Sequence, residues 1–327
     1  MDFNCIIGQK EIVGSLKRSL SEDRVGHAYI FNGPAGIGKE KVAQLFAGLL
    51  LCKQPQSGST CGMCNACLLY RNGTNPDYNR IDIKDISIGV DSIREIQSDV
   101  AIKPMYSKRK VYVIGDAVKM TDQAQNGLLK TFEEPPPFVV VILLTSNYEM
   151  LLETIRSRAQ RFNFRRYTYE QVCQALVERY GSGSNLLELA AGYADGNIGV
   201  ALELADSGEF ATLRERVFEL IAGVSKGTMD DILQFIDFLD ANKERIGLLL
   251  DIILLYYRDL LLVCETGNEK LLINSDKKDM IFFNARLYSS RRVIDSIAAI
   301  EAVRRALKQN ANYQLAIENM LIKFRED

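Results

Sequence analysis

The chain has 327 residues, of which 47% are hydrophobic and 25% charged, an ordinary composition for a protein that folds in water. It excludes a largely disordered chain and leaves room for two or three domains with cores of their own. The formal net charge of −2 argues against a protein that coats nucleic acid by itself, because such proteins usually carry a basic excess.

No targeting or membrane segment is expected. The first five residues lack the basic and apolar regions of a signal peptide. The most apolar stretch, residues 246–263, is interrupted by Asp251, Arg258 and Asp259. We therefore expect a cytoplasmic protein without a membrane span.

A glycine-rich loop follows the first predicted strand, residues 28–31. It reads Gly33-Pro34-Ala35-Gly36-Ile37-Gly38-Lys39, and apolar residues recur at helical spacing behind it. Strand, loop and helix in this order predict a phosphate-binding loop. Its backbone N–H groups, the helix N-terminus and the Lys39 ammonium are the groups that cradle phosphates. The candidate nucleotide residues are therefore Gly33, Gly36, Gly38 and Lys39, and the alternative is an ordinary glycine-rich turn.

The residue after this loop departs from the usual pattern. Glu40 stands where phosphate-binding loops place Ser or Thr, whose hydroxyl holds Mg²⁺. Without that hydroxyl, we expect a site that either holds ADP or ATP weakly without Mg²⁺ or is filled by side chains.

Four cysteines lie close together just after the loop helix. Cys52, Cys61, Cys64 and Cys67 have the spacing Cys-x8-Cys-x2-Cys-x2-Cys, and Gly62 allows a tight turn between the second and third. Thiols of a protein without a secretion signal stay reduced, so a disulfide framework is not expected. Four thiolates suit a tetrahedral, structural Zn²⁺ with no open position for catalysis. The alternatives are iron in place of zinc and four free thiols in a polar loop.

The proline distribution divides the chain. All seven prolines lie at or before position 137, and the rest is rich in helix-forming residues. In the first half of the chain, apolar runs alternate with helical patterns long enough for crossovers, which predicts a parallel five-stranded sheet. The strand candidates are residues 28–31, 78–83, 111–114, 139–144 and 160–164.

The second half is predicted to be helical throughout. Turns are expected at residues 181–184, 192–199 and 207–209. Beyond them, Ile232, Phe235, Ile236 and Leu239 form one apolar helical face, and a strongly apolar helix is expected at residues 245–264. The predicted domains are residues 1–166, carrying the cysteine insertion at about 52–67, then 167–207 and 208–327.

Several motifs occur together in a fixed order, and as a set they resemble the bacterial clamp-loader ATPase family. They are Ile7-Gly8-Gln9, His27-Ala28-Tyr29-Ile30-Phe31-Asn32-Gly33, the cysteine insertion, Val90-Asp91-Ser92-Ile93-Arg94, Leu128-Leu129-Lys130-Thr131-Phe132-Glu133-Glu134-Pro135-Pro136 and Ile155-Arg156-Ser157-Arg158. The resemblance covers about the first 205 residues; the remainder matches in helical type and in Tyr257-Arg258-Asp259. It implies an α/β P-loop (AAA+) domain, a small helical lid domain and an all-α collar domain that joins five subunits into a ring.

Three positions depart from what this family's motor subunits, tau or gamma, use for ATP hydrolysis. Glu40 replaces the metal-binding hydroxyl, Gly115-Asp116 stands where motors carry Asp-Glu, and Gly199 stands where the lid of a motor offers an Arg. These departures favour the family's non-motor type of subunit, delta prime, which does not itself hydrolyse ATP.

Arg158 keeps the chemistry of the family. In Ser157-Arg158-Ala159 it matches the Arg of a Ser-Arg-Cys motif, and this resemblance implies an arginine finger that acts in trans on a neighbour's nucleotide. The alternatives are a solvated basic patch and the nearby Arg156 in the same role.

Thr145 matches the family's polar sensor of the γ-phosphate, and capping the next helix is its alternative role. A further basic segment, formed by Lys103, Lys108, Arg109 and Lys110, is expected to be a solvated edge rather than a DNA groove.

The resemblance implies specific partners. They are the motor subunits tau or gamma, the delta subunit, the beta sliding clamp and, through the assembled complex, primer-template DNA. Two other functions stay open: an active ATPase motor of the same ring, which the retention of Lys39 supports, and a zinc-containing AAA+ DNA-binding protein outside replication.

Overall fold

The computed structural model describes residues 2–56, 58–82, 88–181, 184–226 and 228–325. The chain folds into two compact units. One comprises Met1–Gln171 with Asn197–Gly199, and the other comprises Val172–Gly196 with Val200–Asp327. The first unit is an α/β domain, and the described part of the second is helical, as the proline distribution predicts.

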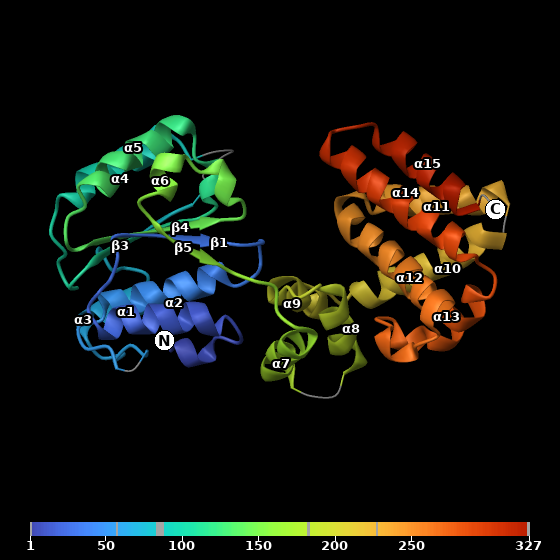
Figure 1. Cartoon of the computed structure of the whole chain (residues 1–327), viewed down its shortest axis with the longest axis horizontal. Helices are drawn as coiled ribbons and strands as arrows, with labels where there is room; N and C mark the ends of the chain where they lie inside the picture. Colours follow the sequence, from blue (N-terminus) through green and yellow to red (C-terminus); the bar gives the residue numbers. More distant parts are fainter. Residues whose placement is uncertain (1, 57, 83–87, 182–183, 227, 326–327) are drawn as a thin grey trace. The chain divides into compact units, whose positions relative to one another are not determined.

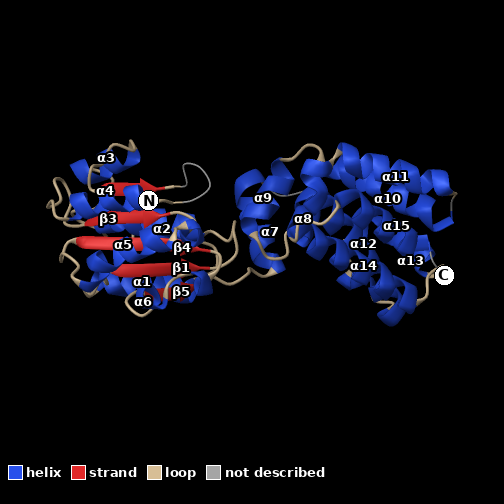
Figure 2. Ribbon diagram, turned by 90° about the horizontal axis from the view of Figure 1, so that it is seen from above, coloured by secondary structure: helices blue, strands red, loops and turns tan. Residues whose placement is uncertain are grey.

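Five parallel strands form the sheet of the first unit (Figure 2). They are β1 (Ala28–Asn32), β2 (Tyr78–Ile81), β3 (Lys110–Ile114), β4 (Val139–Thr145) and β5 (Gln160–Asn163). Their order is β2-β3-β4-β1-β5, and each adjacent pair is parallel, so the predicted sheet is confirmed. Because parallel strands end at the same edge, the loops after β1, β3 and β4 lie side by side there.

Two of the strands are shorter than predicted. β2 ends at Ile81, and the predicted end at Ile83 lies outside the described residues. β5 ends at Asn163 rather than Phe164, although the Phe164 N–H still donates to the Asn32 carbonyl over 2.7 Å.

Helices cover both faces of the sheet (Figure 1). On one face lie α1 (Lys10–Ser21), α2 (Lys39–Leu51) and α3 (Asn65–Arg71), and on the other lie α4 (Val90–Val100), α5 (Asp122–Glu133) and α6 (Glu153–Arg156). Strand side chains alternate between these faces. Ile30 and Leu143 pack with Leu128 of α5, whereas the Tyr29 ring meets Phe46 of α2 edge-on at 5.2 Å between centroids. Both faces are thus buried, which explains why the strands are continuous apolar runs.

The helices beyond the sheet build the second unit, apart from the first residues of α7 and α9, which belong to the first unit. They are α7 (Tyr169–Tyr180), α8 (Asn185–Tyr193), α9 (Ile198–Asp206), α10 (Phe210–Lys226), α11 (Met229–Ala241), α12 (Ile246–Thr266), α13 (Lys278–Ala285), α14 (Ser290–Lys308) and α15 (Tyr313–Arg325). The predicted apolar helix is α12, which packs against α10, α13 and α14 and buries Tyr256 and Tyr257 completely. It ends before Gly267, whose φ of 62° suits a helix C-cap. All four residues of the predicted apolar face are buried on α11.

The helix boundaries agree with two of the three predicted turns. α8 ends at Tyr193 before α9 begins at Ile198, and α9 ends at Asp206 before α10 begins at Phe210. In the turn predicted at 181–184, residues 182 and 183 lie outside the described residues. The division of the helical part into a lid and a collar stays a prediction. Among the described helices, none is both long enough and apolar enough to span a membrane.

Candidate functional site: a closed phosphate-binding loop with an exposed arginine and a cysteine cluster

The predicted phosphate-binding loop joins β1 to α2, as the sequence pattern requires. Gly36 and Gly38 have φ angles of 74° and 88°, which L side chains rarely adopt, so these two positions need glycine. Gly38 is the N-cap of α2, and Lys39 is its first residue. The backbone thus has the curved form of a phosphate cradle at a helix N-terminus.

The Lys39 side chain is turned back onto the loop. Its Nζ donates to the carbonyl oxygens of Gly33 and Pro34 over 2.6 and 2.7 Å. Burial lowers the pKa of the Lys39 ammonium, and the charge of Asp116 opposes this effect. In this conformation the ammonium satisfies the loop's own carbonyls rather than facing a phosphate.

A pocket of about 820 Å³, here called the loop pocket, opens beside this loop. Its walls include the starts of the loops after β3 and β4, so it occupies the edge at which a nucleotide binds in folds of this kind. The positive and negative charges of its side chains are equal in number. They are the basic Lys39, Lys41 and Arg80 and the acidic Glu40, Asp82 and Asp116. A wall with no cationic excess offers little attraction to a triphosphate.

An ion-pair cluster lies beside the loop at the start of α2. The Arg80 guanidinium pairs with Glu40 at the start of α2, and its Nε donates to Asp82 over 2.5 Å. Hydrogen bonds to Asp82 and Glu40 raise the pKa of Arg80 above its usual range. A Cβ built on Gly115 would lie 2.6 Å from Asp82 Oδ1, so this glycine makes room for the cluster. Glu40 and Asp82 thus share one guanidinium, and Gly115 leaves space for it.

The segment Asn197–Gly199 closes the loop from another side. Asn197 Nδ2 donates to the Ala35 carbonyl over 2.7 Å, and the Gly199 N–H donates to the Gly36 carbonyl over 3.1 Å. A Cβ on Gly199 would lie 2.7 Å from the Gly36 oxygen and 2.8 Å from its Cα. In this conformation there is therefore no space for a side chain at position 199.

Gly199→Ala is expected to lower the free energy of unfolding by about 1–3 kcal/mol, because the added methyl group collides with the backbone of Gly36. Gly247→Ala is the matched control. Gly247 is likewise the second residue of its helix, but no atom approaches its Cβ position within 4 Å. Thermal unfolding of both variants tests the prediction, and equal midpoints would contradict it.

The Thr145 side chain is used within its own turn. Thr145 is buried at the end of β4; its hydroxyl donates to the Asn147 carbonyl over 2.9 Å and accepts from the Asn147 N–H over 3.1 Å. Thr145 contributes to the wall of the loop pocket. Its role as a phosphate sensor stays a prediction, and its described contacts are those of a residue that shapes a turn.

Arg158 is exposed, between α6 and β5. One guanidinium nitrogen lies 3.2 Å from Glu133 Oε1 at the end of α5, and another donates to the Thr154 carbonyl over 3.1 Å. The side chain is 38% exposed and the Glu133 side chain 52%. Exposed pairs of this kind contribute little to stability, so Arg158 can exchange Glu133 for another anion at low cost.

The neighbouring arginines have different surroundings. Arg156 pairs with Glu149 and lies over the Tyr148 ring, 5.2 Å from its centroid. Arg161 lies over the same ring at 3.8 Å and donates to Asn163 over 2.7 Å. These two side chains are held in local contacts, which argues against Arg156 as the finger. A solvated basic patch stays an alternative, because the other arginines of this segment are exposed: Arg161, Arg165 and Arg166.

The basic segment near β3 is only partly a solvated edge. Lys110 is 3% exposed and pairs with Asp99 over 2.6 Å, so its assignment to an exposed edge is wrong. Its ammonium also donates to the Asp99 carbonyl, which explains how a lysine is accommodated in a core strand. Arg109 pairs with Asp23, whereas Lys103 and Lys108 are exposed.

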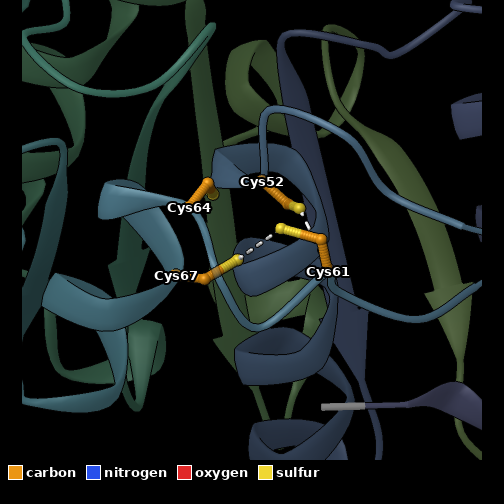
Figure 3. A group of neighbouring side chains, drawn as sticks. All are labelled: Cys52, Cys61, Cys64 and Cys67. Atoms are coloured by element: carbon orange, nitrogen blue, oxygen red, sulfur yellow. Dashed lines mark hydrogen bonds between the residues drawn. The ribbon is translucent and has the colours of Figure 1, made fainter.

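The structure brings the four predicted cysteines together (Figure 3). The Sγ atoms of Cys52, Cys61, Cys64 and Cys67 all lie within 4.8 Å of one another. Cys52 caps the end of α2, Cys64 caps the start of α3, and Cys67 lies in the first turn of α3. Gly62 has a φ of 71°, as expected for the tight turn between the second and third cysteines.

The surroundings of the thiols differ from one cysteine to the next. The Cys61 N–H donates to Cys52 Sγ over 3.3 Å, and Cys61 Sγ lies 3.9 Å from Cys67 Sγ. Backbone N–H groups of Cys64 and Met63 lower the pKa of Cys61 to about 6, whereas burial raises that of Cys67 to about 12. A tetrahedral ion with metal–sulfur bonds of about 2.3 Å separates its sulfurs by about 3.8 Å, so a small contraction of this cluster encloses one ion.

Sequence reasoning missed Arg80, Asp82, Asn197 and Tyr148. Arg80 and Glu40 are 40 residues apart, and Asn197 and Ala35 are 162 apart. No motif carries such contacts, because they join segments that only the folded chain brings together. The one signal in the sequence was that the carboxylate of Glu40 needs a basic partner. Several basic residues of the chain could have been that partner.

Family models match both units. A model described as DNA polymerase III, delta subunit, matches residues 8–168, and one described as its C-terminal part matches residues 209–326. The DNA polymerase III subunit delta′ of Bacillus subtilis is 30% identical over 325 residues, which cover 97% of this chain and 96% of that protein. The chain belongs to the DNA polymerase III clamp-loader family.

Subunits named tau and gamma are also similar to this clamp-loader subunit. The tau subunit of B. subtilis is 32% identical over 284 residues, covering 80% of this chain but 50% of that protein. A DNA polymerase III gamma subunit-related protein from Thermotoga maritima has the same fold, with a TM-score of 0.51 and 21% identity over 96% of this chain and 98% of that one. Both the α/β unit and the helical unit are therefore characteristic of the family.

Proposed function

We propose that this clamp-loader subunit is of the delta prime type: a non-motor stator that helps to load the sliding beta clamp onto primed DNA. The observation that carries the proposal is the Arg80 guanidinium between Glu40 and Asp82, where a motor subunit needs Mg²⁺. Two further contacts support it. Lys39 binds the carbonyls of its own loop, and Gly199 leaves no space for the lid arginine.

The chemistry of ATP hydrolysis explains why these features matter. Phosphoryl transfer requires a metal ion on the phosphates, a residue that orients the attacking water and cationic groups that balance the developing charge. At the metal and water positions this chain has Glu40 and Gly115-Asp116. A loop pocket with equal numbers of acidic and basic groups also lacks the cationic excess. ADP or ATP bound here would be held without productive chemistry.

Arg158 is proposed to act in a neighbouring subunit's site. In a trans arrangement, an arginine from one subunit stabilises the charge on the phosphoryl group transferred in the next. Support comes from the exposure of Arg158 and its weak pairing with Glu133, beside two arginines that are held elsewhere. The proposed partners are the tau or gamma motor subunits, the delta subunit, the beta clamp and, through the complex, primer-template DNA.

The cysteine cluster is proposed to hold one structural Zn²⁺. Cys52, Cys61, Cys64 and Cys67 supply four sulfur ligands and leave no open coordination position, so no catalytic role follows. The ion would fix the insertion between α2 and α3, a segment of polar residues with little apolar surface to bury.

An active ATPase motor is the second candidate, because Lys39 is retained and tau subunits are also relatives. The purified chain is expected to show no ATP turnover with Mg²⁺ above background. Lys39→Ala is the control, since any turnover that survives this substitution comes from a contaminant. Turnover by the unaltered chain that Lys39→Ala abolishes would favour the motor. Family membership itself argues against a role outside replication.

A further inference from the structure

The turn after β4 contacts the chain on both sides of Arg158. Tyr148 begins a short 3-10 helix, Tyr148–Met150, and its ring lies under the guanidinium groups of both Arg156 and Arg161. Arg156 is two residues before Arg158, and Arg161 is three residues after it. One ring thus contacts both ends of the short segment that carries the exposed arginine.

The Tyr148 turn is itself firmly held. The buried Thr145 hydroxyl donates to the Asn147 carbonyl, and Asn147 Oδ1 accepts from the Glu149 N–H over 3.1 Å. Arg156, at the end of α6, pairs with Glu149 of the same turn. These contacts fix the ring relative to the end of β4, a fully buried central strand.

The other end of the segment is tied to the sheet. Arg161 lies on β5 and donates through Nε to Asn163 Oδ1, which also accepts from Asn32 Nδ2 over 3.1 Å. Asn32 is the last residue of β1. The Arg161 guanidinium is therefore held between β5 and the Tyr148 ring, 3.8 Å from the ring centroid.

We propose that Tyr148 is a positioning residue for Arg158: through Arg156 and Arg161 it fixes the direction in which Arg158 extends from the surface. This inference rests on the proposed trans role of Arg158. A guanidinium must reach the transferring phosphoryl oxygens within hydrogen-bond distance, and a displacement of about 1 Å in such a group can reduce a rate by about 100-fold. Cation–π contacts suit this purpose because they fix the plane and distance of a guanidinium without neutralising its charge.

Tyr148 and Glu133 hold Arg158 in different ways. Glu133 contacts Arg158 directly, but the pair is exposed and must open for Arg158 to reach another anion. Among the described contacts, those of the Tyr148 ring are with Arg156 and Arg161, which flank Arg158, so they persist when Arg158 leaves Glu133. The position of Arg158 then depends on the backbone segment rather than on the ion pair.

The test uses the ring rebuilt with motor and delta subunits, in which DNA- and clamp-stimulated ATP hydrolysis is measured. Tyr148→Leu is expected to lower kcat about tenfold at the site that Arg158 completes, with the KM for ATP unchanged. Tyr148→Phe keeps the ring and should retain the rate. Arg161→Met keeps the apolar stem but removes the guanidinium, and it should behave as Tyr148→Leu does.

Tyr180→Leu is the matched control. Tyr180 is a surface tyrosine with Arg179 over its ring at 5.4 Å, on α7 rather than beside Arg158. This variant should leave kcat unaltered. Size-exclusion chromatography and thermal unfolding establish that each variant folds and enters the ring.

The decisive comparison adds Tyr148→Leu to Arg158→Ala. If Tyr148 acts only through Arg158, the double variant has the rate of Arg158→Ala alone. A further loss in the double variant would overturn the inference, and so would an unchanged rate for Tyr148→Leu in a ring that Arg158→Ala impairs. If Arg158→Ala itself has no effect, the proposed finger fails instead.

Discussion

Arg158→Ala in a rebuilt ring is expected to slow ATP hydrolysis at the neighbouring motor subunit by ~10³ to 10⁵-fold, the range observed where arginine fingers have been removed. The physical reason is the loss of a cation beside the transferring phosphoryl group. In a site that excludes most water, such a charge is screened little. The other ATP sites of the ring should keep their own arginines. The steady-state rate of the whole ring should therefore fall only by the fraction of ATP hydrolysis that this one site contributes. A single-turnover measurement resolves the affected site directly.

Two properties of the variant separate loss of the finger from loss of structure. Arg158 and Glu133 are both exposed, so thermal stability should change little on substitution. Arg165→Ala removes the same charge from an exposed residue seven positions along the chain and should leave hydrolysis unaltered. Equal rates for the Arg158→Ala and unaltered rings would rule out the trans role.

Removal of the proposed metal is expected to have the largest effect on stability. Cys64→Ser should reduce the metal content from one ion per chain to none and destabilise the fold by several kcal/mol. For comparison, structural zinc contributes about 10–16 kcal/mol of binding free energy in small peptides. The loss of structure should begin near the cysteine cluster. The insertion between α2 and α3 should become sensitive to protease, because without the ion its polar residues bury little apolar surface.

Elemental analysis, thermal unfolding and limited proteolysis measure these three effects and also distinguish zinc from iron. Cys5→Ser is the matched control, because Cys5 is an exposed thiol outside the cluster. It should retain both the metal and the unfolding midpoint. A chain that purifies without metal and has the same midpoint as Cys64→Ser would contradict a structural metal site.

Much of the α/β unit could be predicted from the sequence because its strands are continuous apolar runs. Such runs occur where both faces of a strand are buried, and in a parallel sheet the long connections leave room for helices on both sides. The strand ends were less certain. β5 ends one residue early, since a local apolar pattern does not show where the last ladder hydrogen bond forms.

The candidate site could be predicted in part, because some of its residues are close together in the sequence. Gly33, Gly36, Gly38 and Lys39 lie in one contiguous motif, and the cysteines lie within sixteen residues, so their spacing alone predicts their chemistry. Lys110 shows the limit of such reasoning. The residues before it are basic, but its own side chain is buried in an interior strand, where Asp99 of α4 provides a half-buried partner.

The sequence by itself determined which functional groups this protein has. They are a loop that can bind phosphates, Glu40 in place of a metal-binding hydroxyl, four clustered thiols and Arg158 in a family motif. Only the tertiary structure decided how these groups are arranged in space. It placed Arg80 against Glu40, Gly199 against Gly36, and Tyr148 beneath the arginines that flank Arg158. The physical reason is that charges and rings interact over a few ångströms of space, whereas a motif records only separation along the chain.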